Sequence, residues 1–130
     1  MELDLLRFSE VMHHTMSPIQ ITDAQGKLIF VNPAFEKVTG YMKEDVLGKN
    51  PRILNSGKQD EGFWKRAWQI ILSGKEWVGQ IQNRRKNGEL FTTELVISPI
   101  IDARGTIVGF LGAHRDITEQ KLLEQQLVRS

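Results

Sequence analysis

The sequence contains no cysteine, its net charge is only +1, and long apolar runs are absent from it. The absence of cysteine excludes disulfide bonds, thiolate metal sites and cysteine nucleophiles, and it favours a reducing compartment, so we expect a cytoplasmic protein. The small net charge gives no bulk attraction to nucleic acid or anionic membrane, and we expect neither as a partner. No apolar run approaches the ~20 residues that a membrane helix needs. Residues 1–7 carry acidic residues and no long apolar stretch, which argues against a signal peptide.

Length and composition fit one globular domain with a helix at either end. Hydrophobic residues make up 40% of the 130 residues and charged residues 25%, enough to bury a single core. Near the N-terminus, apolar residues recur every three or four positions, which predicts an amphipathic helix over residues 1–15. They are Leu5, Phe8, Met12 and Met16. We expect a central domain over residues 16–117, and residues 118–130 to begin a second helix, which Thr118 can cap.

Alternating apolar residues and turn signals predict five strands in the central domain. They are residues 19–21, 28–30, 77–85, 90–101 and 106–115. Asn87-Gly88 is a strong signal for a two-residue hairpin turn, and turns at residues 23–26 and 102–105 contain Asp and Gly. The five strands therefore predict an α+β fold with an antiparallel sheet.

Between the two groups of strands, the sequence predicts short helices. Asn32-Pro33 has the residues of a helix start, and Gly40 those of a helix end. A second short helix is expected over residues 43–47, and a longer one, rich in Trp and Ile, ends before Gly74. These helices must cover one face of the sheet. A pocket between helices and sheet is then the natural ligand site.

Five short motifs, in their order and spacing, resemble the PAS family of sensor domains over roughly residues 16–118. They are Ile21-Thr22-Asp23 with Gly26, Val31 to Phe35 with Thr39-Gly40-Tyr41, Val46 to Arg52, Asn83 to Gly88, and Asp116-Ile117-Thr118 before Glu119. The resemblance implies a five-stranded antiparallel sheet with short helices on one face and flanking terminal helices. It also implies a sensory module of a larger signal-transduction protein, such as a two-component histidine kinase or a cyclic-dinucleotide enzyme.

The last helix suggests how such a module would pass on a signal. Asp116-Ile117-Thr118 ends a strand and starts a helix, so it couples the sheet to whatever follows. Leu123 and Leu127 lie on one face of that helix without an obvious partner in the chain, which favours pairing with another copy. We therefore expect a homodimer through the terminal helices and a covalently linked effector domain in the full-length protein.

Two kinds of PAS cofactor chemistry do not fit the residues present. Light-sensing flavin relatives carry a cysteine directly after the Asn that corresponds to Asn50, and this cysteine bonds the flavin on illumination. Pro51 takes that place here and the chain has no cysteine, so adduct photochemistry is excluded. Haem relatives use a histidine before the third strand, but no histidine occurs between Ile19 and Ala113.

Redox-sensing flavin domains fit better. The segments Glu76 to Gly79, Asn83 to Lys86 and Gly112 to Asp116 resemble aerotaxis receptors and nitrogen-fixation redox regulators, which bind FAD non-covalently. The resemblance implies FAD as the cofactor, with FMN or no cofactor as the alternatives, and redox or oxygen sensing as the function. Its candidate ligand-binding residues are Asn50, Arg52, Asn55, Trp77, Asn83, Thr93 and His114.

Each candidate has a chemical role in this reading. Trp77 would stack as a wall, Asn83 and Thr93 would face the polar edge of the ring, and His114 would report the protonation state of the ring to the exit helix. Of the loop residues, Asn50 and Asn55 would add hydrogen bonds and Arg52 would meet a phosphate.

Structural roles explain the same residues equally well. Trp77 can be a core aromatic residue, Asn83 can satisfy backbone groups, and His114 can be an ordinary strand residue. Asn50 and Asn55 can be turn and cap residues. The alternative function is therefore a cofactor-free PAS domain for dimerisation and signal relay, or one that binds another small ligand.

Catalysis is not expected. The acidic residues are scattered and form no acid–base pair by spacing. The sequence contains neither a Gly-x-Ser-x-Gly hydrolase motif nor a phosphate-binding loop with its Lys-Ser or Lys-Thr. We therefore expect a binding module and not an enzyme.

Overall fold

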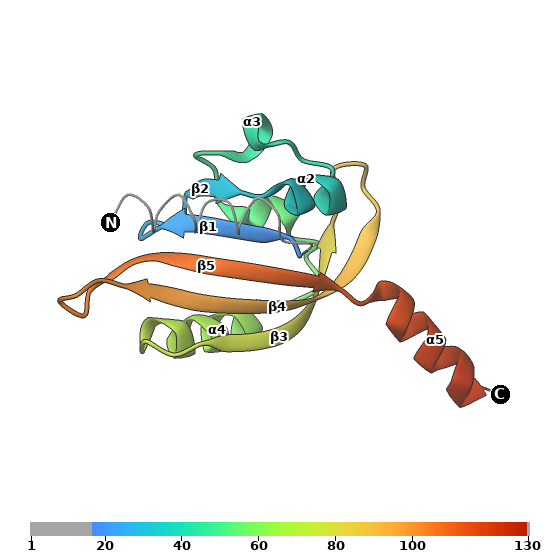
Figure 1. The fold of residues 1–130 in the computed structure, drawn as a ribbon. Helices are drawn as coiled ribbons and strands as arrows, with labels where there is room; N and C mark the ends of the chain where they lie inside the picture. Colours follow the sequence, from blue (N-terminus) through green and yellow to red (C-terminus); the bar gives the residue numbers. More distant parts are fainter. Residues whose placement is uncertain (1–16, 130) are drawn as a thin grey trace.

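The computed structural model describes residues 17–129, and it shows an antiparallel sheet with helices packed on it (Figure 1). The amphipathic helix expected over residues 1–15 lies outside the described residues. The strands are β1 (Ile19–Asp23), β2 (Leu28–Val31), β3 (Trp77–Arg84), β4 (Leu90–Ile101) and β5 (Ile107–Asp116). They form one sheet in the order β2-β1-β5-β4-β3. The first hairpin therefore adds to the three-stranded meander through β1 and β5, which the sequence pattern alone did not specify.

The helical elements lie mainly between β2 and β3. They are α2 (Pro33–Thr39), α3 (Lys43–Val46), the 3₁₀ helix η1 (Pro51–Leu54), α4 (Glu61–Leu72) and the C-terminal α5 (Thr118–Arg129). All five expected strands and the expected helices of the central domain are present, with ends that differ by at most a few residues. The predicted α+β class is thus confirmed. Whether residues 16–117 act as a separate unit stays a prediction.

Asn32 shows why the first helix begins where it does. Its side-chain oxygen accepts hydrogen bonds from the backbone N–H groups of Ile19 and Phe35, and its amide nitrogen donates to the carbonyl of Ser17. The residue is completely buried. One side chain therefore caps α2 and fixes the start of β1, as expected for Asn before a Pro at the first helical position. Gly40 ends α2 with a left-handed φ of 79°, which favours glycine.

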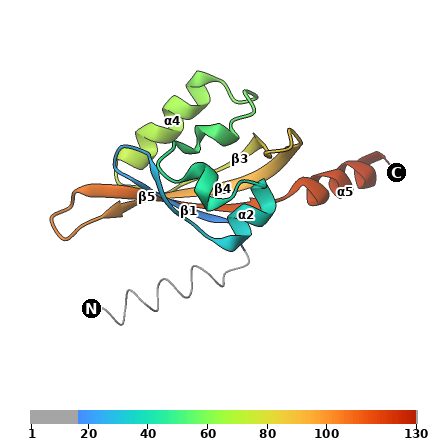
Figure 2. The ribbon, with the colours of Figure 1, turned by 90° about the horizontal axis from the view of Figure 1, so that it is seen from above.

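Two apolar clusters hold the helices to the sheet. The first joins α4 to β3, β4 and β5 and consists of Ala67, Ile71, Trp77, Ile81, Leu95, Ile97 and Phe110. The second joins β2, α2, α3 and η1 and consists of Leu28, Val31, Phe35, Val46 and Leu54. Viewed from above, α4 lies on one side of the sheet (Figure 2). The space between the two clusters is where the candidate site lies.

Candidate functional site

A cavity of about 890 Å³ lies between one face of the sheet and the elements η1 and α4. This volume falls in the range of small-molecule and cofactor sites. Leu54 from one apolar cluster and Ile81, Leu95, Ile97 and Phe110 from the other contribute to its lining. The polar and aromatic residues on the lining include Gln20, Asn50, Arg52, Asn55, Trp64, Trp68, Asn83 and His114. Five of the seven sequence-predicted site residues are therefore brought together here.

Asn83 is the most informative polar residue on the lining. Its side chain comes from β3 and is 4% exposed, yet no hydrogen bond joins its carboxamide to another described residue. Only its backbone is paired, with Phe91 across the hairpin and with Asn55 in an isolated bridge. Among the described residues, Nε1 of Trp64 is the one fully buried side-chain polar atom without a hydrogen-bond partner, so the carboxamide of Asn83 is open to the cavity and can meet a ligand there. The alternative reading, in which Asn83 satisfies backbone groups with its side chain, has no support among the described residues.

His114 and Gln20 form a buried pair on the opposite part of the lining. The ring Nε2 of His114 lies 2.9 Å from the carboxamide oxygen of Gln20, so the neutral ring carries its proton on Nε2 and donates it to that oxygen. Burial lowers the pKa of His114 to about 4. Gly112 makes room for the pair, because a Cβ there would lie 3.0 Å from Cγ of Gln20. His114 is therefore a neutral hydrogen-bonding group at neutral pH.

The loop residues at the cavity serve partly as caps. The side-chain oxygen of Asn50 accepts from the backbone N–H of Arg52 at 2.9 Å, which starts η1. The oxygen of Asn55 accepts from the N–H of Gly57 at 2.7 Å. Both cap roles were among the sequence-based alternatives. The exposed Arg52 also lies on the lining, and its guanidinium forms no ion pair with the other described residues.

Trp77 and Thr93 lie outside the cavity lining. The ring of Trp77 packs against Phe63 and Trp64, with centroid separations of 5.7 and 5.9 Å, and it covers Gly79, where any Cβ would collide with it. The hydroxyl of Thr93 donates to the backbone carbonyl of Arg115 at 3.0 Å. The expectation that Trp77 forms a ligand wall and that Thr93 faces a ring edge therefore needs correction. The ring of Trp77 packs in the apolar core, and the hydroxyl of Thr93 is hydrogen-bonded to the neighbouring strand β5.

The aromatic walls of the cavity are instead Trp64 and Trp68 on α4. Trp68 packs edge-on against Phe110 at 5.1 Å between centroids. The indole N–H of Trp64 is buried and has no hydrogen-bond partner within residues 17–129. The spacing of these residues by four on one helix was the available signal, but it did not say which face of α4 meets the cavity. Gln20 was missed because its strand pattern reads as an ordinary alternation.

Comparison with known proteins agrees with this architecture. A family model described as "PAS domain" matches residues 16–119. The chain belongs to the PAS family. It is 33% identical over 120 residues to a nitrogen fixation regulatory protein of Klebsiella oxytoca, which covers 92% of this chain and 24% of that protein. It is 32% identical over 114 residues to a blue-light-activated histidine kinase of Brucella canis, covering 85% and 23% of the two chains.

An RNA-binding Light-Oxygen-Voltage receptor has a solved structure with the same fold. Its TM-score is 0.88 at 29% sequence identity, and the match covers 98% of this chain and 37% of that one. This PAS domain spans about a quarter of the length of the curated relatives it matches. The relatives are thus larger proteins that contain a PAS module, and several are regulators or kinases by name. None of the described helices is long and apolar enough to span a bilayer.

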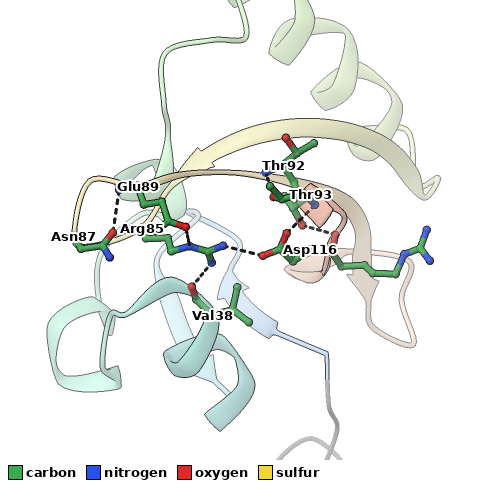
Figure 3. A network of polar contacts seen from close by, with 9 residues as sticks. Val38, Arg85, Asn87, Glu89, Thr92, Thr93 and Asp116 are labelled. Atoms are coloured by element: carbon green, nitrogen blue, oxygen red, sulfur yellow. Dashed lines mark hydrogen bonds and ion pairs between the residues drawn. The ribbon is translucent and has the colours of Figure 1, made fainter. Parts of the chain in front are cut away.

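The exit of the PAS domain is held by a polar network around Arg85 (Figure 3). Its guanidinium donates to the carboxylate of Asp116 at 2.9 Å, to Glu89 and to the backbone carbonyl of Val38, and it lies 4.3 Å above the ring of Phe91. Burial by itself raises the pKa of Asp116, but the hydrogen bonds from Arg85 and Thr118 outweigh it and lower the pKa of the carboxyl. One side chain thus joins the end of α2, the β3–β4 hairpin and the end of β5.

Thr118 completes the junction with α5. Its hydroxyl oxygen accepts from the backbone N–H of Thr92 at 2.8 Å, and its own N–H donates to Asp116 at 3.0 Å. Ile117 between them is 3% exposed. Beyond this point α5 extends away from the sheet (Figure 1). A displacement at the end of β5 would therefore move the first turn of α5 directly.

Proposed function

We propose that this PAS domain binds FAD non-covalently in its cavity and acts as a redox or oxygen sensor that signals through α5. The observation that carries the proposal is the carboxamide of Asn83, which forms no hydrogen bond with the other described residues and lies on the wall of a cavity of about 890 Å³. A ligand with a donor and an acceptor at one edge would complete the hydrogen bonding of this amide. The sequence resemblance to FAD-binding regulators favours FAD as this ligand.

The residues present suit a flavin. Its ring is flat and largely apolar, and it offers an N–H and carbonyl oxygens along its pyrimidine edge. Trp64 and Trp68 provide aromatic surface, Asn83 provides a donor and an acceptor, and His114 with Gln20 provides a second polar group. The flavin supplies the electron-accepting chemistry. The protein contributes binding, orientation and the exclusion of water.

The phosphates of FAD would lie toward the open side of the cavity. Arg52 and Lys65 are exposed residues of the lining there, and a guanidinium pairs well with phosphate oxygens. FMN, with one phosphate, would need only one of these cations. The proposal of FAD over FMN therefore depends on both cations contributing to binding.

The proposal includes the setting of the domain. The module would be cytoplasmic, would have no catalytic activity of its own, and would control a linked effector domain as part of a homodimer. Leu122 and Leu123 on α5 are 56% and 53% exposed, which supports pairing of this helix with a second copy. The same exposure favours the second candidate function, a cofactor-free PAS domain that only dimerises and relays a signal.

A visible absorption spectrum of the freshly purified protein, with mass spectrometry of the heat-released ligand, separates the two functions. Flavin bands and released FAD support the sensor function. A colourless protein is then mixed with FAD and followed by flavin fluorescence. If the protein still does not bind FAD, the relay function replaces the sensor function.

A further inference from the structure

The segment between η1 and α4 runs along the outer edge of β3. Strand β3 lies at one end of the sheet, so the backbone N–H and C=O groups on its outer edge need partners from outside the sheet. Residues 55–60, which we call the strap, provide some of these partners. Asn55 of the strap and Asn83 of β3 form an isolated antiparallel bridge. The strap therefore lies beside the strand that carries the polar residue of the cavity wall.

Gln82 is the residue of β3 to which two side chains of the strap bind. The hydroxyl of Ser56 donates to the backbone carbonyl of Gln82 at 2.7 Å. In the orientation that satisfies both of its groups, the carboxamide of Gln59 accepts from the backbone N–H of Gln82 at 2.7 Å and donates to its carbonyl at 3.2 Å. These two side chains thus take the place of a neighbouring strand at this point of β3.

The strap contains no apolar side chain, since its sequence is Asn-Ser-Gly-Lys-Gln-Asp. Gly57 and Lys58 are exposed, and a Cβ at Gly57 would meet no atom within 4 Å. The chain is anchored on both sides of the strap, because Leu54 is buried in one apolar cluster and Phe63 packs against the other. A polar segment between two fixed points, with few apolar contacts of its own, can open while the rest of the domain stays folded.

The strap also forms part of the cavity wall. Asn55 and Gln59 line the cavity together with Asn83. The polar groups that a ligand would contact lie deep in the cavity, since Asn83 and His114 are 4% and 5% exposed. A ligand reaches them only after it has passed the rim, so the part of the rim that moves most easily controls its entry.

Other parts of the rim are held more firmly than the strap. The turn between β1 and β2 is fixed by the carboxylate of Asp23, which accepts from the backbone N–H groups of Gln25 and Lys27, both at 2.9 Å. Helix α4 is anchored by Ala67 and Ile71, which are completely buried in the apolar core. Opening of the strap breaks only polar contacts, and water can replace these hydrogen bonds.

We propose that the strap is the gate of the cavity and that it opens as a unit when its hydrogen bonds to Gln82 break. The inference rests on the proposed function only for the identity of the ligand. In the open state, water binds the N–H and C=O groups of Gln82. In the closed state, a ligand on Asn83 would lie next to the Asn55 bridge, and its presence would oppose opening.

Amide hydrogen exchange of the ligand-free full chain, measured by NMR, tests whether the strap opens as a unit. In the parent, the N–H of Gln82 should exchange at least about 100-fold faster than the N–H of Leu95 in the buried strand β4, because local opening needs no global unfolding. Ser56→Ala removes a bond to the carbonyl of Gln82 and leaves the bond from its N–H to Gln59 in place. Exchange at the Gln82 N–H should nevertheless become about tenfold faster, since both bonds break in one opening.

Ser73→Ala is the matched control variant. The hydroxyl of Ser73 also donates to a backbone carbonyl, that of Ile70 at 2.6 Å, at the other end of α4. This variant should leave exchange at the Gln82 N–H unchanged. Equal exchange rates at Gln82 and Leu95 in the parent would overturn the proposal, and so would a Gln82 rate that Ser56→Ala does not change.

The indole N–H of Trp64 reports access to the cavity without any ligand. Trp64 lines the cavity, and its N–H is buried and has no hydrogen-bond partner within residues 17–129, so the entry of water limits its exchange. We expect Ser56→Ala to speed this exchange about tenfold and Ser73→Ala to leave it unchanged. The same rate in the parent and in Ser56→Ala would show that the strap does not control access, which would overturn the proposal.

Stopped-flow fluorescence with FAD tests the entry of the proposed ligand. Ser56 does not line the cavity, so Ser56→Ala should raise the association and dissociation rate constants together, each about tenfold, and leave the Kd unchanged. A rise in the dissociation rate constant alone would assign Ser56 to ligand contact and overturn the gate. If the parent does not bind FAD, the proposed function fails, while exchange at Gln82 and at the Trp64 indole still decides the proposal about the strap.

Discussion

The carboxamide oxygen of Gln20 lies 2.9 Å from Nε2 of His114, although the two residues are 94 positions apart in the chain. The contact joins β1 to β5 on the cavity wall, and the glycine at position 112 provides the space for it. Both side chains are buried. Burial disfavours the charged imidazolium and lowers the pKa of His114, so protonation of His114 should oppose folding.

The stability of the domain should consequently depend on pH through His114. Its pKa falls from the ordinary 6.5 to about 4 on folding, so the unfolded chain binds the proton more tightly. The contribution of His114 to the free energy of unfolding should be fully present above pH 6.5. It should be lost as the pH drops toward 4, by on the order of 3 kcal/mol. Urea denaturation between pH 8 and pH 4 measures this dependence.

His114→Gln should remove most of that dependence, because glutamine does not titrate. The comparison is made as the difference between variant and parent at each pH, which cancels the contributions of the carboxylates. A difference that stays constant from pH 8 to pH 4 would contradict the depressed pKa.

Asn83→Leu and Thr93→Val should have opposite effects on stability and different effects on binding. Asn83→Leu replaces an amide that forms no hydrogen bond with the described residues by an apolar side chain at a position that is 4% exposed, and should raise the free energy of unfolding of the ligand-free protein by about 1 kcal/mol. It should also weaken FAD binding about tenfold or more, which corresponds to about 1.4 kcal/mol. Chemical denaturation and fluorescence titration measure the two quantities.

Thr93→Val is the control for that experiment. It removes the hydroxyl that donates to Arg115 and should lower stability by about 1 kcal/mol, while FAD affinity stays the same because Thr93 does not line the cavity. If Thr93→Val weakened binding as much as Asn83→Leu, the assignment of the lining would be wrong.

Gly79→Ala should destabilise the domain by about 1–3 kcal/mol, because the new methyl group would displace the ring of Trp77 from the core. Gln80→Ala, at the next and exposed position of β3, should change stability by no more than about 0.5 kcal/mol. Thermal and urea unfolding give both values. A tolerated Gly79→Ala would show that the Trp77 ring has room to move.

Arg85→Ala should loosen the junction with α5. Loss of the charged hydrogen bonds to Asp116 and Val38 should cost about 1.5–3 kcal/mol, and amide exchange at the start of α5 should become faster than in the parent. Arg85→Lys keeps the charge without the planar fork and should recover only part of the loss. Arg84→Ala, at the neighbouring exposed position, should leave amide exchange at the start of α5 unchanged. An equal increase in both variants would show that the loss of a positive charge, and not the loss of the Arg85 hydrogen bonds, causes the effect.

The fold was largely predictable from the sequence because its signals are local. Asn32-Pro33, Gly40 and Asn87-Gly88 each dictate a backbone turn or cap, and the alternation in residues 90–101 matches β4 to the residue. The strand order was not predictable, because the pairing of β1 with β5 joins segments about 90 residues apart and depends on packing that no local pattern encodes.

The site was less predictable than the fold. Asn83 and His114 were placed on the cavity because strand alternation gives their direction once the sheet is known. Trp77 was misplaced because the pattern Trp-x-Gly describes a ring folded over its own strand as well as it describes a ligand wall. Trp64 and Trp68 reach the cavity only through the rotation of α4, and a helix pattern does not contain that angle.

Both apolar clusters contribute side chains to the cavity lining, and the polar residues of the lining belong to neither cluster. Gln20, Asn83 and Arg52 can be exchanged during evolution, or by design, while Phe35 and Ile71 keep the scaffold intact. A few substitutions in the lining can therefore change which ligand the cavity binds, while α5 stays joined to the end of β5.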